Sequence, residues 1–135
     1  MDPLRRTTTN PKIERLLKVM EAFRLFDREM PASVVSCFLY VASHNDCHKQ
    51  ALEEDLVMKT SSGSRNTDWL SKYHRLNKPG LNLIIKEPDP DNRRRQQLRL
   101  SPKGEQLVKL IEDLLYDETA DVSRQETTKG SDQEL

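Results

Sequence analysis

Apolar residues recur at spacings of three and four in five stretches of this 135-residue chain, and this period predicts five helices. Polar or proline-containing breaks separate the stretches, and Asn10-Pro11 and Ser101-Pro102 are typical helix starts. The second stretch is apolar on most sides, so it predicts the most buried helix. The predicted helices cover residues 11–29, 31–44, 49–57, 60–75 and 102–117.

The pattern between the fourth and fifth predicted helices is strand-like. An apolar run at 81–86 and alternating apolar residues at 96–100 predict two short strands. Prolines, aspartates and an asparagine at 88–92 predict the turn between them, which is followed by Arg93, Arg94 and Arg95. The order of elements predicts a mainly α (α+β) winged helix-turn-helix fold. Its third and fourth helices form the helix-turn-helix, and the arginine hairpin forms the wing.

Composition divides the chain into a folded domain and two polar ends. With 35% hydrophobic and 33% charged residues, the chain is polar for a compact domain, so part of it is expected to stay unpacked. We expect a flexible basic arm at 1–10 and a winged helix-turn-helix domain with flanking dimerisation helices at 11–117. A disordered acidic tail is expected at 118–135.

Charge is distributed unevenly, although the net charge is zero. Residues 59–103 contain 11 Lys and Arg against 4 Asp and Glu, whereas residues 104–135 contain 3 against 9. A basic middle next to an acidic end is typical of a protein that binds a polyanion. A solvated charged face is the alternative for a charge run alone. The coincidence with a predicted helix and wing favours nucleic acid.

Several function classes find no support in the sequence. No apolar run approaches the ~20 residues of a membrane span, and no apolar segment follows the first residues, so we expect a cytoplasmic protein that binds no membrane. No glycine-rich phosphate loop, nucleophile elbow or pair of cleft carboxylates indicates an enzyme, and no cofactor is expected. Cys37 and Cys47 lack metal-type spacing and are expected to be free thiols.

The chain from about Leu52 to Leu115 resembles the MarR family of bacterial winged-helix regulators. The helix-turn-helix part of this match consists of Leu52, Leu56, Ser61, Ser62, Ser64, Arg65 and Leu70. The more specific wing part consists of Asp89, Pro90, Arg94, Leu98, Leu100, Ser101 and Gly104. The resemblance implies a homodimeric transcriptional regulator that binds duplex DNA, with a small-molecule effector between its dimer region and its DNA-binding lobe.

The resemblance assigns the DNA contacts to two segments. At the start of the recognition helix, Arg65 suits guanine and Asn66 suits adenine, and the serines suit phosphate or cap the helix. The wing arginines suit a narrow minor groove, and one of them is expected to pair with Asp89 or Asp91. The candidate DNA-binding residues are Ser61, Ser62, Ser64, Arg65, Asn66, Arg93, Arg94 and Arg95. The further phosphate candidates are Lys59, Lys72, Arg75, Lys78 and Lys86.

Two apolar stripes exceed what a domain of this size buries by itself, so a symmetric partner is expected. The first helix contributes Ile13, Leu16, Leu17, Met20, Phe23 and Phe26. The final helix contributes Leu107, Leu110, Ile111, Leu114 and Leu115.

Other features leave an alternative function open. Gly63 and Thr67 stand where members of the MarR family bury aliphatic residues, which predicts a loosely held recognition helix. A loosely held recognition helix, an acidic tail and a single apolar C-terminal helix favour an alternative function. In that alternative the protein is a protein-protein adaptor without sequence-specific DNA readout. Cys37 is expected to be a buried thiol, and Cys47 is the better candidate for redox sensing.

Overall fold

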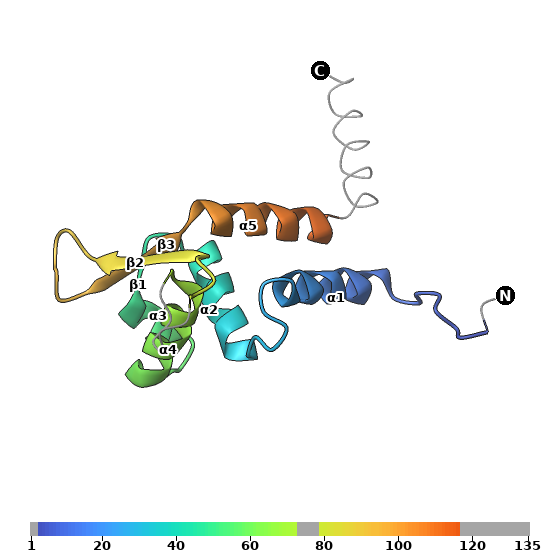
Figure 1. The fold of residues 1–135 in the computed structure, drawn as a ribbon, viewed down its shortest axis with the longest axis horizontal. Coiled ribbons are helices and arrows are strands. Elements are labelled where there is room, and N and C mark those ends of the chain that lie inside the picture. Colours follow the sequence, from blue (N-terminus) through green and yellow to red (C-terminus); the bar gives the residue numbers. More distant parts are fainter. Residues whose placement is uncertain (1–2, 73–78, 117–135) are drawn as a thin grey trace, which may run out of the picture.

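The structure is a computed structural model that describes residues 3–72 and 79–116 (Figure 1). Over these residues the helices are α1 (Pro11–Arg24), α2 (Ala32–Ser43), α3 (Lys49–Asp55), α4 (Thr60–Leu70) and α5 (Pro102–Leu115). The strands are β1 (Cys47–His48), β2 (Ile84–Pro88) and β3 (Gln96–Leu100). The predicted mainly α winged helix-turn-helix fold is confirmed. The predicted acidic tail lies outside the described residues.

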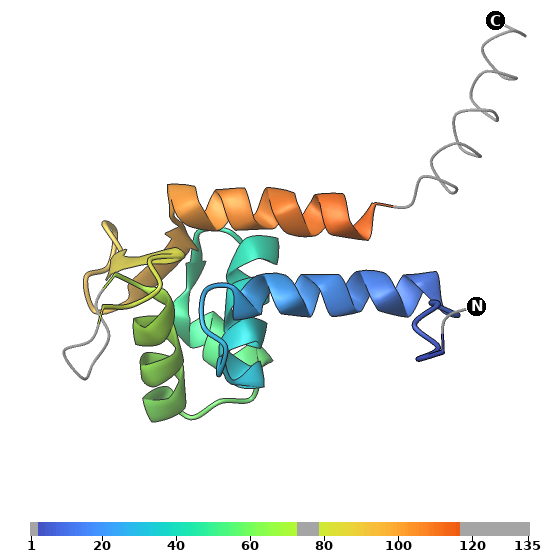
Figure 2. The ribbon, with the colours of Figure 1, turned by 45° about the vertical axis from the view of Figure 1, so that its right-hand side comes forward.

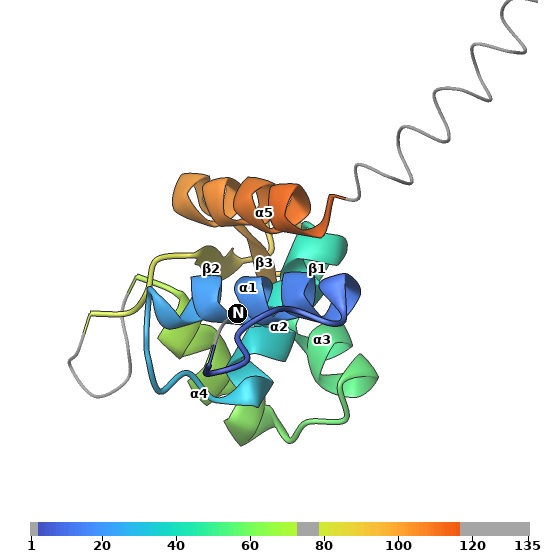
Figure 3. The same cartoon turned by 90° about the vertical axis from the view of Figure 1, so that its right-hand side faces the viewer.

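The elements form a lobe and a pair of projecting helices. The lobe contains α2, α3, α4 and the sheet, while α1 and α5 pack side by side and extend away from it (Figures 1 and 2). Figure 3 looks along these two helices from the end that holds the start of α1. The loop between β2 and β3 extends at the opposite end of the molecule (Figure 1).

The core lies between α2, the sheet and the inner faces of the other helices. The sheet is antiparallel in the order β1-β3-β2, and the buried Leu98 of β3 lies opposite Cys47 on one side and Lys86 on the other. Phe23 of α1 meets Phe38 of α2 edge to face, with ring centroids 5.6 Å apart. The prediction that the second helix is deeply buried is confirmed by its buried residues Val34, Val35, Cys37, Phe38, Tyr40 and Val41.

Two helices end earlier than the apolar period predicts. α1 ends at Arg24 rather than near residue 29, because the N–H groups of Leu25 and Phe26 turn back to the carbonyls three residues earlier, those of Ala22 and Phe23. α3 ends at Asp55 rather than at 57, because Val57 takes the left-handed conformation with φ 53°. In both places apolar residues continue at helical spacing beyond the end of the helix, so this spacing alone overestimates the length of the helix.

The start of β2 is set by the end of α4. The N–H groups of Leu81 and Leu83 donate to the carbonyls of Trp69 and Leu70. The backbone of these residues is therefore bonded to the last turn of α4, and the strand begins at Ile84 rather than at 81. The prediction that the fourth helix runs to 75 is wrong, because α4 ends at Leu70 and the backbone of its C-cap residue, Ser71, is extended with ψ −175°.

β1 is an element that the sequence pattern did not predict. It is two residues long, which is too short to show alternation, and it pairs with β3 so that His48 lies opposite Gln97. α3 begins at the next residue, Lys49. His48 is therefore fixed at the junction of the sheet and the helix-turn-helix.

Val57 occupies a strained backbone position in the turn between α3 and α4. It is β-branched and 90% exposed, and its φ is 53°. The left-handed conformation costs a residue with a Cβ about 1–2 kcal/mol, and glycine avoids that cost. We expect Val57→Gly to raise the free energy of unfolding by about 1 kcal/mol in urea titrations.

Val57→Ala is the matched control, because alanine keeps a Cβ and should gain less than glycine. If Val57→Gly is less stable than the parent protein, the left-handed turn at this position is contradicted.

Candidate nucleic-acid interface

α4 approaches α3 closely at a glycine. A Cβ built on Gly63 would lie 2.1 Å from Oε2 of Glu53, so a larger residue does not fit while Glu53 keeps its place. Thr67, one turn later, is buried, and its hydroxyl donates to the Gly63 carbonyl at 2.7 Å. The prediction that Gly63 and Thr67 loosen this helix is wrong, because Gly63 lets α4 approach Glu53 of α3 and the buried Thr67 accepts a hydrogen bond from Lys86 of β2.

Lys86 attaches the other side of α4 to β2. Its ammonium donates to Oγ1 of Thr67 at 3.0 Å and to Oδ1 of Asp68 at 2.8 Å, and its side chain is 12% exposed. This pairing removes Lys86 from the phosphate candidates and makes it a support of α4. The orientation of α4 is therefore set from both α3 and β2.

The first turn of α4 has no side-chain cap. Its N-cap residue is Lys59, and no side chain there accepts a hydrogen bond from the helix start, so the prediction that a serine caps this helix is wrong. The first N–H groups of a helix have no intrahelical acceptor, and the helix dipole favours an anion beside them. This turn can accept a phosphate group.

The candidate base contacts on α4 point in different directions. Arg65 is exposed, and its Nη2 donates to Oγ of Ser62 at 3.4 Å. Asn66 turns inward, and its amide donates to Sδ of Met58 at 3.6 Å. Ser64 is partly buried, whereas Ser61 is exposed. Arg65 is therefore the long polar side chain that the first two turns of α4 present to solvent.

The residues at the wing tip are exposed: Arg93, Arg94 and Arg95. Within the described part of the chain, none of these three side chains forms an ion pair. The predicted pairing with Asp89 or Asp91 is wrong, because Oδ2 of Asp89 lies 2.6 Å from Nε2 of His48. The three guanidinium groups thus keep their charge available to a polyanion.

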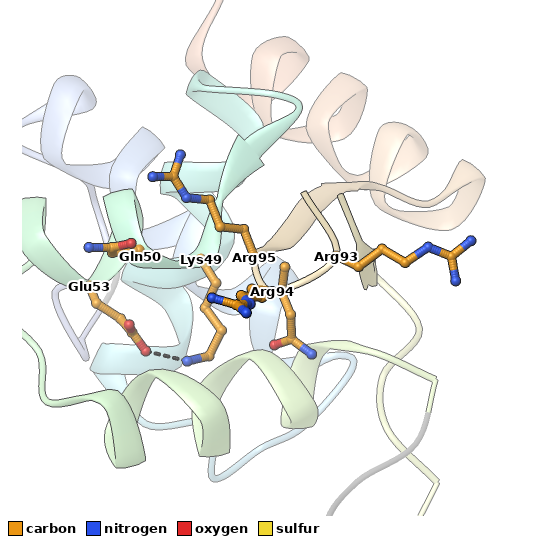
Figure 4. A pocket seen from close by; sticks show the side chains of 7 residues that line it. Lys49, Gln50, Glu53, Arg93, Arg94 and Arg95 are labelled. Carbon is orange, nitrogen blue, oxygen red and sulfur yellow. Dashed lines mark hydrogen bonds and ion pairs between the residues drawn. The ribbon is translucent and has the colours of Figure 1, made fainter. Parts of the chain in front are cut away.

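A hollow of about 310 Å³ separates the wing tip from α3 (Figure 4). It is lined by Lys49, Gln50, Glu53, Arg93, Arg94, Arg95 and Gln96. The Lys49 ammonium is paired with the Glu53 carboxylate inside it, whereas Figure 4 shows Arg93 pointing away from that pair. Because the acidic group is already neutralised, the wing arginines give this hollow a positive character.

Both cysteines are free, and both are kept protonated. Burial raises the pKa of the Cys37 thiol to about 11, and its Sγ donates to Sδ of Met58 at 3.7 Å. Burial also raises the pKa of the half-buried Cys47. A redox sensor needs a thiolate, so these environments disfavour that role. No three His, Cys, Asp or Glu side chains of the described residues group as a metal site.

The projecting helices expose apolar side chains at the end far from the wing. Leu17 is 58% exposed, and Leu16, Ile13 and Met20 are exposed on the same helix. Phe23, by contrast, is 1% exposed and belongs to the core rather than to this surface. On α5 the exposed apolar residues of this end are Leu110 and Leu115, and the C-cap residue Tyr116 is exposed as well. None of the helices in the described ranges has the length and apolar character that crossing a membrane requires.

No protein-family model matches the sequence, and no curated protein matches it. Solved structures do match. The MepR–DNA complex of S. aureus has a TM-score of 0.60 at 15% identity, covering 90% of this chain and 88% of that chain. A MarR transcriptional regulator from Methanosarcina mazei has a TM-score of 0.57 at 10% identity, covering 88% of each chain.

The crystal structure of MarR itself has a TM-score of 0.52 at 22% identity and covers 90% of this chain and 96% of that chain. The chain therefore has the fold of the MarR transcriptional regulators over about 90% of its length. This confirms the fold that the wing and helix-turn-helix motifs implied.

Sequence reasoning missed the residues that position the interface. His48 and Glu53 carry no motif, and Lys86 was expected to bind phosphate rather than to hold α4. The role of each is defined by a contact with another element. His48 and Asp89 are 41 positions apart, so no local spacing links them. The acidic Asp89 was a signal that the wing has a partner, but only the fold identifies that partner.

Proposed function

We propose that the protein is a cytoplasmic DNA-binding transcriptional regulator that acts as a homodimer and is not an enzyme. The observation that carries the proposal is the presence, on one winged-helix lobe, of an exposed Arg65 on α4 and three exposed wing arginines that form no ion pair with the described residues. The relatives of this fold named MepR and AbfR were solved bound to DNA, which supports duplex DNA as the partner.

The proposed contacts follow from the arrangement of the lobe. α4 lies in the major groove, where Arg65 donates two parallel hydrogen bonds to guanine and Ser61, Ser62 and Ser64 bind phosphate. The wing arginines follow the minor groove and its flanking phosphates. Asn66 reads a base only if its amide leaves Met58. The basic arm at 1–10 and the acidic tail at 118–135 flank the DNA-binding domain at 11–117 in this proposal.

The exposed apolar surface of α1 and α5 supports the homodimer. Leu16, Leu17 and Leu110 would be buried against the same residues of a second copy, which gives a symmetric interface. Because this surface lies away from the wing, two copies joined there leave both α4 helices free (Figure 1). A two-fold dimer of this kind recognises two half-sites on one DNA.

Two arginine substitutions test how the lobe reads DNA. Arg94→Ala should weaken binding to all duplexes. It should also reduce the slope of log binding constant against log salt concentration by about one phosphate contact. Arg65→Ala should weaken the free energy of binding to the preferred site by roughly 1–3 kcal/mol and that to random duplex by less, because a base contact stabilises the complex only when the matching base is present. Fluorescence anisotropy titrations at about 50 mM and about 200 mM salt measure both effects.

Lys109→Ala is the matched control, since it removes one exposed positive charge from α5, outside the proposed DNA-binding interface. Equal losses for Arg65→Ala on preferred and random duplex contradict base reading by α4. If neither arginine variant differs from Lys109→Ala, the basic lobe is not the DNA-binding surface and the adaptor function is favoured.

A further inference from the structure

His48 joins the helix-turn-helix to the wing. Its Nε2 lies 2.6 Å from Oδ2 of Asp89, and the side chains are 38% and 13% exposed, respectively. His48 itself is held on two sides, because it pairs with Gln97 of β3 through the backbone and directly precedes α3. The imidazole is therefore attached to the rigid lobe rather than to the wing loop.

Asp89 connects this imidazole to the turn that carries the arginines. Its second carboxylate oxygen, Oδ1, accepts from the N–H of Asp91 at 2.9 Å. Its backbone N–H donates to the Arg95 carbonyl at 2.8 Å, and its carbonyl accepts from the N–H of Asn92 at 3.2 Å. One residue thus determines both the shape of the turn at 89–95 and its attachment to the lobe.

Little else holds the turn at 89–95 in place. The paired part of the wing ends where Pro88 faces Gln96. Among the described residues, the contact between His48 and Asp89 is the side-chain hydrogen bond that links the turn to the rest of the molecule, and no other such bond is found there. Without this contact, only the pairing of β2 with β3 would orient the turn that carries the arginines.

The charged groups around the imidazole come from the wing and from α3. A hollow of about 230 Å³ beside His48 is lined by Gln50, Ala51, Glu54 and Arg95 as well. Asp89 and Arg95 belong to the wing, Glu54 belongs to α3, and the uncharged Gln97 faces His48 from β3. Asp46 and Lys49 are the nearby charged residues along the chain. Asp89 is the charged group in hydrogen-bond contact with the ring.

We propose that His48 is a positioning residue for the wing, and that protonation of its imidazole strengthens the hold on Asp89 and so tightens DNA binding. The proposal rests on the proposed function, since DNA binding is its readout. It adds a pH-dependent element that neither the wing motif nor the recognition helix contains.

The sign of the pH effect follows from the two ionisations. The backbone N–H of Asp91 and the His48 contact lower the pKa of Asp89, so this carboxyl stays ionised from acid pH through neutrality. Histidine is the side chain that most readily changes charge near neutral pH, and it gains a proton as the pH falls. The neutral ring offers Asp89 an ordinary hydrogen bond, whereas the protonated ring offers a charge-assisted one. Wing order and DNA affinity should therefore rise toward pH 6.

Titration of a duplex at about pH 8 and about pH 6, at constant ionic strength, measures this effect. We expect the affinity of the parent protein to rise about threefold more between these values than that of His48→Gln. Glutamine keeps a donor without a titrating charge, so His48→Gln should bind better than His48→Ala at pH ~8. Asp89→Asn should also remove the extra pH response, and adding it to His48→Gln should change little further.

His44→Gln is the matched control, because His44 stacks on Tyr40 at the end of α2, and its hydrogen bonds among the described residues go to Ser43 and Tyr40. It should keep the pH response of the parent protein. If His48→Gln and His44→Gln respond to pH equally, the proposed role of His48 is overturned.

A second readout does not depend on DNA. The heteronuclear NOE of the Asn92 to Arg95 backbone amides should be lower in His48→Gln than in the parent protein, and lower in the parent at pH ~8 than at pH ~6. If the protein binds no duplex at either pH, the proposed function fails. The NOE then decides the positioning role alone, and unchanged values overturn it.

Discussion

The double substitution Leu16→Glu with Leu17→Glu is expected to convert a dimer into a monomer and to lower the affinity for an inverted-repeat duplex by about a hundredfold or more. Both leucines are exposed on α1, so the variant should fold. In a symmetric interface each glutamate is introduced twice and loses its solvation, which disfavours association. The large loss on DNA follows because one half-site then binds without the other.

Sedimentation at micromolar concentration and anisotropy on the same duplex measure this result. Leu25→Glu is the control, because Leu25 is an equally apolar residue, 81% exposed, at the lobe end of α1. It should leave the dimer intact. A parent protein that sediments as a monomer contradicts the proposed homodimer, and a double variant that stays dimeric moves the interface to another surface.

Gly104→Ala is expected to lower the free energy of unfolding by about 2–3 kcal/mol. Gly104 lies in the first turn of α5, where a Cβ would lie 2.0 Å from the carbonyl oxygen of Leu83 and 3.0 Å from its carbonyl carbon. That carbonyl cannot retreat, because it accepts from the N–H of Ser101 at 3.1 Å, while Ser101 caps α5 through the N–H of Gly104. The added methyl group therefore forces the start of α5 away from the sheet.

Thermal unfolding should show the loss for Gly104→Ala as a decrease of about 10 °C in the midpoint. Glu105→Ala, an exposed substitution in the same turn, is the control and should change the midpoint little. Equal midpoints for Gly104→Ala and Glu105→Ala contradict the close approach of α5 to Leu83.

The features that sequence alone predicted are those with a local cause. Asn10 and Ser101 cap their helices as expected, with Oδ1 and Oγ accepting from the N–H groups three residues later at 3.2 and 2.9 Å. The wing was predicted because turn residues and alternating leucines occur together in a short stretch. Each of these signals acts within a few residues, so no knowledge of the fold is needed.

The features that sequence did not predict depend on contacts between distant segments. The Glu53 side chain occupies the place that a Cβ on residue 63 would take, and His48 determines what Asp89 binds. The apolar period of α1 is another example, because it gives the buried Phe23 and the exposed Leu17 the same weight. The apolar period identifies a face of the helix, but only the packing of α5 and of Phe38 from α2 against α1 divides that face into core and surface.

Selection of bound sequences from a random pool of duplex DNA tests most directly whether this winged-helix lobe reads DNA sequence. We expect enrichment of an inverted repeat whose half-sites lie about one helical turn, roughly 10 bp, apart or at a multiple of it. Arg65→Ala should lose the preference for guanine at one position in each half-site. A pool that the wild-type protein retains but does not enrich for any sequence would contradict sequence recognition by α4.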